Sequence, residues 1–288
     1  MKELGLQAGG AYDEGDYGKG LELYRQLLDK DPDNAVYLNN MGVLLLKSGQ
    51  PDAASEAFER ASIRAPENPS YLVNAGFALI KLEDYEKAET FFDRALQLDP
   101  SHGRAVYGLG VLYLYLNELE IAYNYFMKAV ALDPMNIQSL FMEAYSAQKN
   151  GLWKDAAKGY TAYIGLSDET EQKANAYCNR ALCYMKLGRQ ADAMKDFDEA
   201  VSLNGESAVI FYNRAQGYQA ALKYEEAVLD YTRAISRKVN FPEAYINRGE
   251  MSYLLGQKAK GCHDLRRACE LGYCEALEKY QSAGKCED

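Results

Sequence analysis

The sequence has few of the residues that catalysis and metal binding need. It contains only two histidines, His102 and His263, in 288 residues. His263 follows Cys262, but adjacent residues of a helix do not face each other. The sequence also lacks an HExxH motif, a phosphate-binding loop and a pair of CxxC motifs. We therefore expect that the protein is not an enzyme and that it needs no cofactor and no metal.

Basic runs and long apolar runs are absent as well. The formal net charge is −10, which opposes binding to the phosphates of DNA or RNA. Apolar runs such as 43–46 are far shorter than the roughly 20 residues that span a bilayer, and the N-terminus lacks the apolar core of a signal peptide. We expect a cytoplasmic protein that binds no nucleic acid and does not insert into membranes. A signal peptide encoded upstream would instead allow a periplasmic location.

Cysteine is too sparse for a disulfide-rich scaffold. The six cysteines are Cys178, Cys183, Cys262, Cys269, Cys274 and Cys286. Cys262 and Cys269 on one helix would lie about 10 Å apart, which is too far for a disulfide or a shared zinc. Only Cys269 and Cys274, across an expected turn, could meet. We favour the interpretation that the cysteines are small buried thiols in a reducing compartment.

A repeat of 34 residues is what the sequence does contain. Pro32, Pro66, Pro100 and Pro134 are spaced at this interval, and such a period is typical of stacked helical repeats. A short helix over 274–283 would cap the last repeat, since a terminal repeat needs a cover for its apolar face. The repeats cover residues 1–34, 35–68, 69–102, 103–136, 137–173, 174–207, 208–241 and 242–275.

Three positions of the repeat hold one kind of residue throughout. Positions 8 and 20 are glycine or alanine in all eight repeats, and position 24 is aromatic in seven of them. Small residues let two antiparallel helices approach closely, and the aromatic ring fills the wedge between them and the next repeat. This pattern resembles the tetratricopeptide-repeat (TPR) family across essentially the whole chain. The resemblance implies an all-α, right-handed solenoid in which the first helix of each repeat, helix A, lines a concave face.

A second pattern marks repeats six to eight. Arginine at position 7 and aspartate at position 23 occur together in these three repeats and in none of the others. Because a charge near a packed helix interface needs a partner, we expect structural ion pairs, either within a repeat or between neighbours. The residues are Arg180, Arg214, Arg248, Asp196, Asp230 and Asp264.

Repeat five is three residues longer than the others. Its additional residues lie near Asp168 and Glu171, whose spacing predicts a capping box. Helix A of repeat six is therefore expected to begin near Glu169, about one turn early.

The resemblance implies that ligands contact helix A at positions 2, 5, 6, 9, 12 and 13. Asparagines at position 6 resemble the ladders of O-GlcNAc transferase and importins and could bind a peptide backbone, or they bond to neighbouring helices. Lysines at position 13 could attract acidic side chains, or they form a solvated face. Aromatic residues suit binding hot spots. The candidates are Asn40, Asn74, Asn179, Asn213, Asn247, Lys47, Lys81, Lys149, Lys186, Phe77, Tyr107, Tyr115, Phe141, Tyr145 and Tyr212.

These features predict an adaptor that holds an extended or helical segment of a partner protein in its concave groove. The alternatives are a scaffold that self-associates through its uncapped first repeat, and a regulatory arm of a larger assembly. No three consecutive repeats supply the lysine and asparagine set of the cochaperone carboxylate clamp, so this subclass is not expected. The run at 261–277 is similar to the last repeat of many bacterial TPR proteins, which favours a bacterial source.

Overall fold

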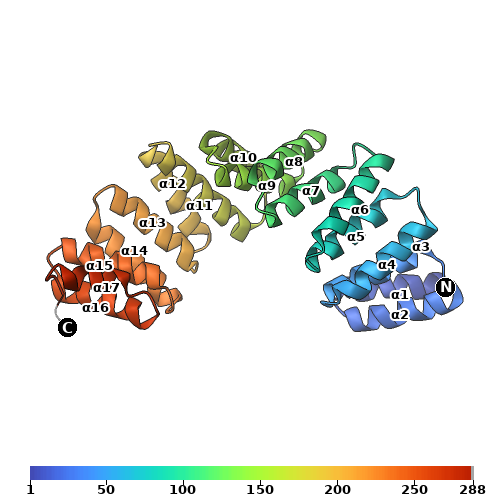
Figure 1. The fold of residues 1–288 in the computed structure, drawn as a ribbon, viewed down its shortest axis with the longest axis horizontal. Coiled ribbons are helices and arrows are strands. Elements are labelled where there is room, and N and C mark those ends of the chain that lie inside the picture. Colours follow the sequence, from blue (N-terminus) through green and yellow to red (C-terminus); the bar gives the residue numbers. More distant parts are fainter. Residues whose placement is uncertain (287–288) are drawn as a thin grey trace. The chain divides into compact units, whose positions relative to one another are not determined.

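The computed structural model describes residues 1–286, and every regular element in that range is an α-helix. The all-α helical-repeat architecture predicted from the sequence is confirmed (Figure 1). The helices are α1 (Lys2–Asp13), α2 (Tyr17–Lys30), α3 (Ala35–Lys47), α4 (Pro51–Arg64), α5 (Pro69–Lys81), α6 (Tyr85–Leu98), α7 (Gly103–Tyr115), α8 (Leu119–Leu132), α9 (Ile137–Lys149), α10 (Trp153–Leu166), α11 (Thr170–Lys186), α12 (Gln190–Leu203), α13 (Ala208–Ala220), α14 (Tyr224–Arg237), α15 (Pro242–Leu254), α16 (Lys258–Glu270) and α17 (Glu275–Ser282).

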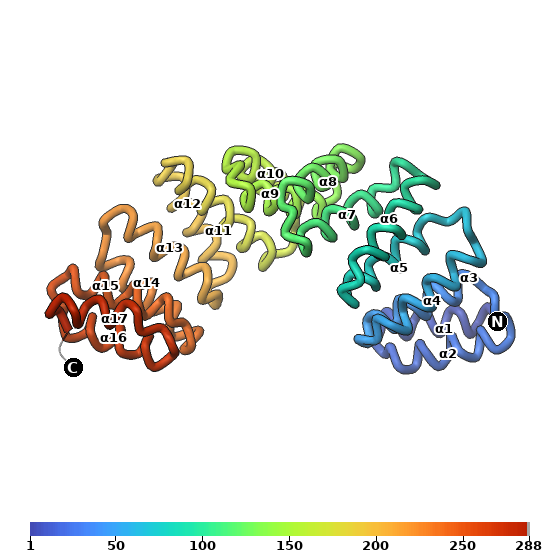
Figure 2. The backbone as a smooth tube through the Cα atoms, viewed as in Figure 1, coloured from blue at the N-terminus to red at the C-terminus, as the bar shows by residue number. Residues whose placement is uncertain are grey.

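The helices form two compact units, Met1–Ser146 and Ala147–Asp288, called unit 1 and unit 2 below. In unit 1, α3 packs against α4, α5 against α6 and α7 against α8 (Figure 2). In unit 2, the same relation joins α11 to α12, α13 to α14 and α15 to α16. The odd-numbered member of each pair is helix A of its repeat, and the even-numbered member is helix B.

The turn between the two helices of each repeat contains one residue in the left-handed conformation. It stands at position 15, and its φ lies between 59° and 78° in all eight repeats. Glycine adopts this conformation without the steric penalty that a Cβ atom brings. The sequence supplies glycine in five of the eight turns: Gly15, Gly49, Gly151, Gly188 and Gly256. The other three turns have Glu83, Asn117 and Leu222 at this position.

The aromatic residues at position 24 lie in the core of repeats one to seven, and Leu265 takes this place in repeat eight. Phe58, Phe92 and Phe126 are at most 1% exposed. A Cβ atom placed on the glycine at position 8 of the same repeat would lie 2.7 Å from a ring carbon of each phenylalanine. The ring therefore occupies the space that the missing side chain leaves, which explains why both positions have a fixed residue type.

Two glycines let the backbones of α15 and α16 approach closely in repeat eight. Its positions 8 and 20 are Gly249 and Gly261, and a Cβ atom on Gly261 would lie 2.7 Å from the carbonyl oxygen of Gly249. A backbone oxygen cannot rotate away as a side chain can. We expect Gly261→Ala to separate α15 from α16 and to lower the free energy of unfolding by about 1–3 kcal/mol, measured by urea denaturation followed by circular dichroism.

Gly165 provides the matched control. It lies in α10, and a Cβ atom there would meet nothing within 4 Å. Gly165→Ala should raise stability by up to about 1 kcal/mol, because alanine loses less backbone entropy in a helix. Equal effects of the two substitutions would contradict the close approach of α15 and α16.

Each arginine at position 7 of repeats six to eight binds the aspartate at position 23 of its own repeat. The closest nitrogen–oxygen distances are 2.7 Å for Arg180–Asp196, 2.6 Å for Arg214–Asp230 and 2.8 Å for Arg248–Asp264. Each contact is bidentate, through Nε and Nη2. The Nη1 atom of each arginine donates to position 25 of the preceding repeat: to Thr161 Oγ1, Asp198 Oδ1 and Thr232 Oγ1.

Helix α11 begins at Thr170, one turn earlier than the equivalent helices, so the expected early start is confirmed. The expected capping box is wrong. The cap residue is Glu169, which makes no side-chain hydrogen bond to the helix. Its backbone N–H instead donates to Ser167 Oγ at 3.3 Å. The buried serine fixes the chain direction before the helix, which leaves Asp168 outside the cap position.

The short helix α17 covers the apolar side of the last repeat. Leu277 packs with Cys262 and Leu265 of α16, and the ring of Tyr280 contacts that of Tyr253 at 5.2 Å between centroids. Its bounds, Glu275–Ser282, lie within the range expected for a capping helix.

Four cysteines near the C-terminus form disulfides, so the expectation of buried thiols is wrong for them. Cys269 pairs with Cys274, and Cys262 pairs with Cys286. The second pair was missed because the chain after α17 returns to α16, which no repeat pattern indicates. Cys178 and Cys183 are buried free thiols, as expected. Burial raises the pKa of Cys178 to about 11 and that of Cys183 to about 12.

Within residues 1–286, none of the helices is both long enough and apolar enough to cross a membrane. No cluster of three or more potential metal ligands occurs in this same range.

Candidate functional site

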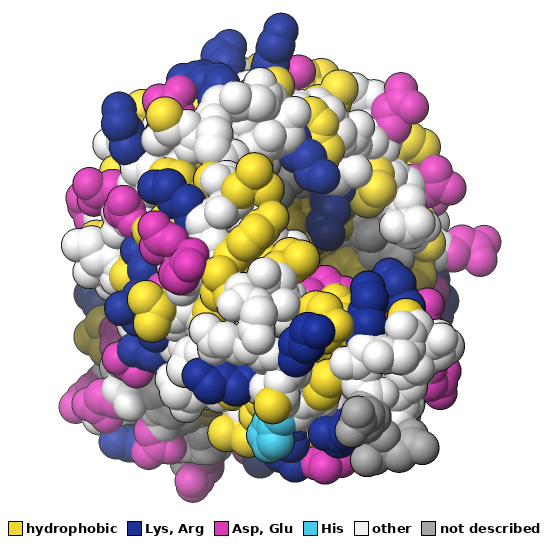
Figure 3. Space-filling model, turned by 90° about the vertical axis from the view of Figure 1, so that its left-hand side faces the viewer, with side chains coloured by type: hydrophobic (Ala, Val, Ile, Leu, Met, Phe, Trp, Pro, Cys, Tyr) yellow, Lys and Arg dark blue, Asp and Glu magenta, His cyan; other side chains and the backbone are white. Residues whose placement is uncertain are grey.

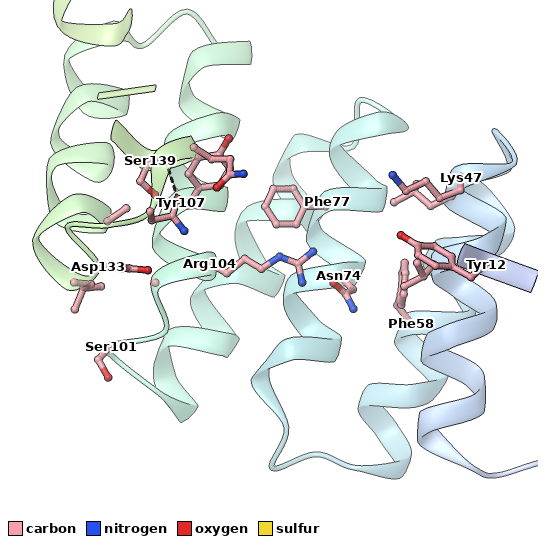
Figure 4. Close-up of a pocket in the computed structure, with 17 residues that line it drawn as sticks. Tyr12, Lys47, Phe58, Asn74, Phe77, Ser101, Arg104, Tyr107, Asp133 and Ser139 are labelled. Atoms are coloured by element: carbon pink, nitrogen blue, oxygen red, sulfur yellow. Dashed lines mark hydrogen bonds between the residues drawn. The ribbon is translucent and has the colours of Figure 1, made fainter. Parts of the chain in front are cut away.

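A groove of about 820 Å³ lies along the A helices of unit 1 (Figure 4). We call it the unit 1 groove. Helices α1, α3, α5, α7 and the beginning of α9 contribute most of its walls, and α4 and α8 contribute apolar side chains from below. The side chains on which the argument depends are Tyr12, Lys47, Asn74, Phe77, Arg104, Tyr107 and Asp133.

The aromatic side chains of the groove rest on the buried core. Phe77 packs edge-on against Phe92, with 5.3 Å between ring centroids, and Tyr107 packs in the same way against Phe126 at 5.5 Å. Phe77 and Tyr107 are themselves 6.4 Å apart. Burial raises the pKa of Tyr107, so its hydroxyl stays protonated. Because fixed rings lose little entropy on binding, they can serve as preformed anchors.

Arg104 lies at the centre of the unit 1 groove. It reaches from α7 towards α5, with its guanidinium beside the ring of Phe77 (Figure 4); the distance from Cζ to the ring centroid is 5.3 Å. Arg104 is exposed, but the surrounding groove atoms displace part of its water and lower its pKa. None of the ion pairs in residues 1–286 involves Arg104. Arg180, Arg214 and Arg248, by contrast, each hold an aspartate.

The position-6 asparagines donate hydrogen bonds to neighbouring parts of the chain. Asn74 donates to Asn39 Oδ1 at 2.7 Å, Asn213 to Cys178 Sγ at 3.2 Å and Asn247 to Tyr212 Oη at 3.1 Å. Each of these bonds spans 35 residues and therefore joins two successive A helices. Asn40 donates to Tyr24 Oη at 3.1 Å. These four amides link helices, and of the five candidates only Asn74 lines the unit 1 groove. Asn179 lies half-buried on α11.

The position-13 lysines each end an A helix. Lys47, Lys81, Lys149 and Lys186 are the last residues of α3, α5, α9 and α11. A cation is favourable at this end of a helix because of the partial negative charge there. Only Lys47 lines the unit 1 groove, where it lies beside Tyr12 (Figure 4).

The other predicted aromatic residues lie outside this groove. Tyr115 is 56% exposed and stacks on Tyr85 with 6.1 Å between centroids. Tyr212, in unit 2, packs against Phe241 at 4.8 Å and Tyr231 at 5.7 Å. Phe141 and Tyr145 lie half-buried on α9.

Most residues that line the groove were not among the predicted site residues, which include only Lys47, Asn74, Phe77 and Tyr107 of them. Two of the missed residues, Tyr12 and Arg104, could have been found. Tyr12 stands at position 12 of repeat one and Arg104 at position 2 of repeat four, and both are positions at which the family resemblance implies ligand contact. Their positions within the repeats therefore indicated that these two residues could contact a ligand. Arginine occurs at position 2 in repeat four alone, so it belongs to no pattern along the chain.

Two of the described cavities lie in unit 2, and both are smaller. The larger one, of about 490 Å³, is lined by Arg248 and Asp264, which already bind each other. On the molecular face turned to the viewer in Figure 3, basic and acidic side chains are interspersed, and no broad area carries one sign of charge. Unit 1 therefore contains the better-formed candidate site.

Comparison with family models gives matches to the tetratricopeptide repeat at residues 11–73, 69–102, 103–136 and 174–207. Together these matches cover more than half of the chain. The last three have the same bounds as repeats three, four and six.

The chain is also similar to individual proteins. It is 30% identical to human sperm-associated antigen 1 over 108 residues, which is 38% of this chain but only 11% of that protein. Among solved structures, a tetratricopeptide repeat protein from Parabacteroides merdae has a TM-score of 0.58 at 22% identity and covers 87% of this chain and 98% of its own. YrrB, described as a TPR protein with an unusual peptide-binding site, has a TM-score of 0.58 at 25% identity, over 66% of this chain and 96% of that one.

Proposed function

The chain belongs to the tetratricopeptide-repeat family, whose members generally mediate protein–protein interactions, and we propose that it is an adaptor that binds an extended segment of a partner protein in the unit 1 groove. The observation that carries this proposal is the set of half-buried rings, Phe77 and Tyr107, held in a groove of about 820 Å³. Aromatic side chains in such places are enriched among residues that dominate binding energy. The similarity to YrrB, a protein with a peptide-binding site, supports the same function.

A binding role also suits the chemistry of the groove better than catalysis does. Its side chains are aromatic rings, aliphatic groups, amides, two serine hydroxyls, two cations and one carboxylate. That carboxylate, Asp133, accepts a hydrogen bond from the backbone N–H of Met135 at 3.1 Å. No histidine or cysteine is among these residues, and these side chains are the most frequent general base and the most reactive nucleophile of covalent catalysis. The groove is therefore better suited to holding a ligand than to transforming one.

The proposal is tested by selecting linear peptides from a random library with the purified full chain. Peptides of about twelve residues extend to about 40 Å, long enough to run past several repeats. Selected peptides are labelled with fluorescein, and their dissociation constants are measured by fluorescence anisotropy. We expect Tyr107→Ala to weaken binding at least tenfold, because truncating a hot-spot ring removes about 2 kcal/mol or more of binding energy.

Tyr115→Ala is the matched control. Tyr115 lies on the same helix, α7, but outside the unit 1 groove. Its truncation should change peptide affinity less than about twofold, as expected for a residue away from the contact. Circular dichroism of both variants checks that the helices remain formed. The proposal fails if no linear peptide is selected, or if the two variants bind the selected peptides equally well.

A further inference from the structure

The unit 1 groove contains more positive than negative charge, although the whole protein carries a net charge of −10. Its charged side chains are Lys47, Arg104 and Asp133. Asp133 already accepts a backbone hydrogen bond from Met135. The groove is therefore a local exception to the acidic character of the chain, and an anionic ligand would be attracted to it.

Neither cation of the groove, Lys47 nor Arg104, takes part in an ion pair among the described residues, and Arg104 is the one at its centre. Every other described arginine that lies on an A helix, namely Arg180, Arg214 and Arg248, makes a bidentate contact to a buried aspartate. Arg104 has only the ring of Phe77 below its guanidinium. A guanidinium that lies on an aromatic ring keeps its planar fork of donors available at the edge, and this fork matches the two oxygens of a carboxylate.

Resting on the proposed function, we infer that the segment bound in the unit 1 groove is acidic, with an Asp or Glu side chain paired to Arg104 and an apolar side chain on Phe77 and Tyr107. The carboxylate would receive two N–H donors from Arg104 and would replace the water that the guanidinium retains. The neighbouring rings exclude further water and strengthen this pair. Such a segment differs from a generally acidic chain because it needs an acidic residue next to an apolar one.

The test uses the peptides selected with the full chain. Each is synthesised in three forms, with Glu, Gln or Lys at the position of the acidic residue that is proposed to pair with Arg104. We expect the Glu form to bind the wild-type protein about tenfold to a hundredfold more tightly than the Gln form, since a charge-assisted hydrogen bond exceeds a neutral one. Raising the salt concentration should weaken the Glu form more than the Gln form. Arg104→Gln should remove the preference for Glu without changing the affinity for the Gln form by more than about threefold.

Two further variants separate ion pairing from a structural role of Arg104. Arg104→Glu should reverse the preference, so that the Lys form binds best. Arg94→Gln is the matched control, because Arg94 also lies over a phenylalanine ring, 5.4 Å from Phe91, but does not line the groove; it should leave all three affinities unchanged.

The possible outcomes separate this inference from the proposed function. If the selected peptides bind, and Tyr107→Ala weakens them, but the Glu and Gln forms bind equally, the acidic preference is refuted while groove binding stands. The same conclusion follows if Arg104→Gln leaves the preference for Glu intact. If no linear peptide binds the groove, both the function and the inference are refuted.

Discussion

Replacing Asp230 with alanine should lower the free energy of unfolding by about 3–5 kcal/mol, because it leaves the nearly buried guanidinium of Arg214 with only an exposed partner. The Asp230 side chain is completely buried, and that of Arg214 is only 11% exposed. Asp230 accepts from Arg214 Nε at 2.6 Å and Nη2 at 3.0 Å, and from Arg233 Nη1 at 2.6 Å. After the substitution, Arg214 keeps its Nη1 contact to Asp198. Urea denaturation followed by circular dichroism measures the loss.

Asp198→Ala is the control within the same network. Asp198 also pairs with Arg214, at 2.9 Å, but its side chain is 62% exposed. Exposed ion pairs contribute at most about 1 kcal/mol, so this variant should unfold near the wild-type urea concentration. If the two aspartates prove equally important, burial does not determine the strength of this network.

The paired substitution Arg214→Met with Asp230→Leu gives a second check. It removes both charges together, and apolar replacements of a buried ion pair are often neutral or stabilising. We therefore expect it to recover most of the stability that Asp230→Ala loses. Amide hydrogen exchange should show that the loss in the single variant is concentrated in α13 and α14, because stability in a stacked repeat is largely local.

The sequence predicts the features that depend on contacts within one repeat. Phe92 and Gly76 meet because two antiparallel helices joined by a short turn bring positions 24 and 8 together. Arg214 and Asp230 meet for the same reason, 16 residues apart. Such contacts repeat along the chain, and each additional copy strengthens the pattern. Side-chain partners across repeats are harder to predict. Asn213 and Asn247 occupy the same position but donate to a cysteine and to a tyrosine.

Features that occur once cannot be predicted from a repeat pattern. Arg104 is proposed as a binding residue of the unit 1 groove because it takes part in no described ion pair, and a sequence does not show which charges are left unpaired. Tyr12 and Lys47 line one end of the same groove, yet they come from different repeats and share no motif. The candidate site is therefore only partly predictable: the repeat frame indicates which face binds, and the packed structure determines which residues of that face enclose a cavity.

The two C-terminal disulfides also occur only once in the chain, and removing them should cause a large loss of stability. Cys262 and Cys286 are 24 residues apart in sequence, and their disulfide holds the chain after α17 against α16. Closing a loop of that length restricts the unfolded chain and stabilises the folded one by about 3 kcal/mol. We expect Cys286→Ala to lower the stability of the last repeat by this amount. Cys274→Ala, which opens the pair separated by only 5 residues, should have a smaller effect of about 2 kcal/mol.

Thiol counting decides whether these pairs exist, independently of stability. The unfolded, non-reduced protein should show two reactive thiols, Cys178 and Cys183, out of six cysteines; six reactive thiols would refute both disulfides. In the folded protein, these two should react slowly, because burial raises their pKa to about 11 and about 12 and keeps them protonated at neutral pH.

Dithiothreitol should destabilise the wild-type protein but not a variant that lacks all four C-terminal cysteines. Since α17 covers the final repeat, its loss on reduction should first increase hydrogen exchange in α15 and α16, and leave the unit 1 groove unchanged.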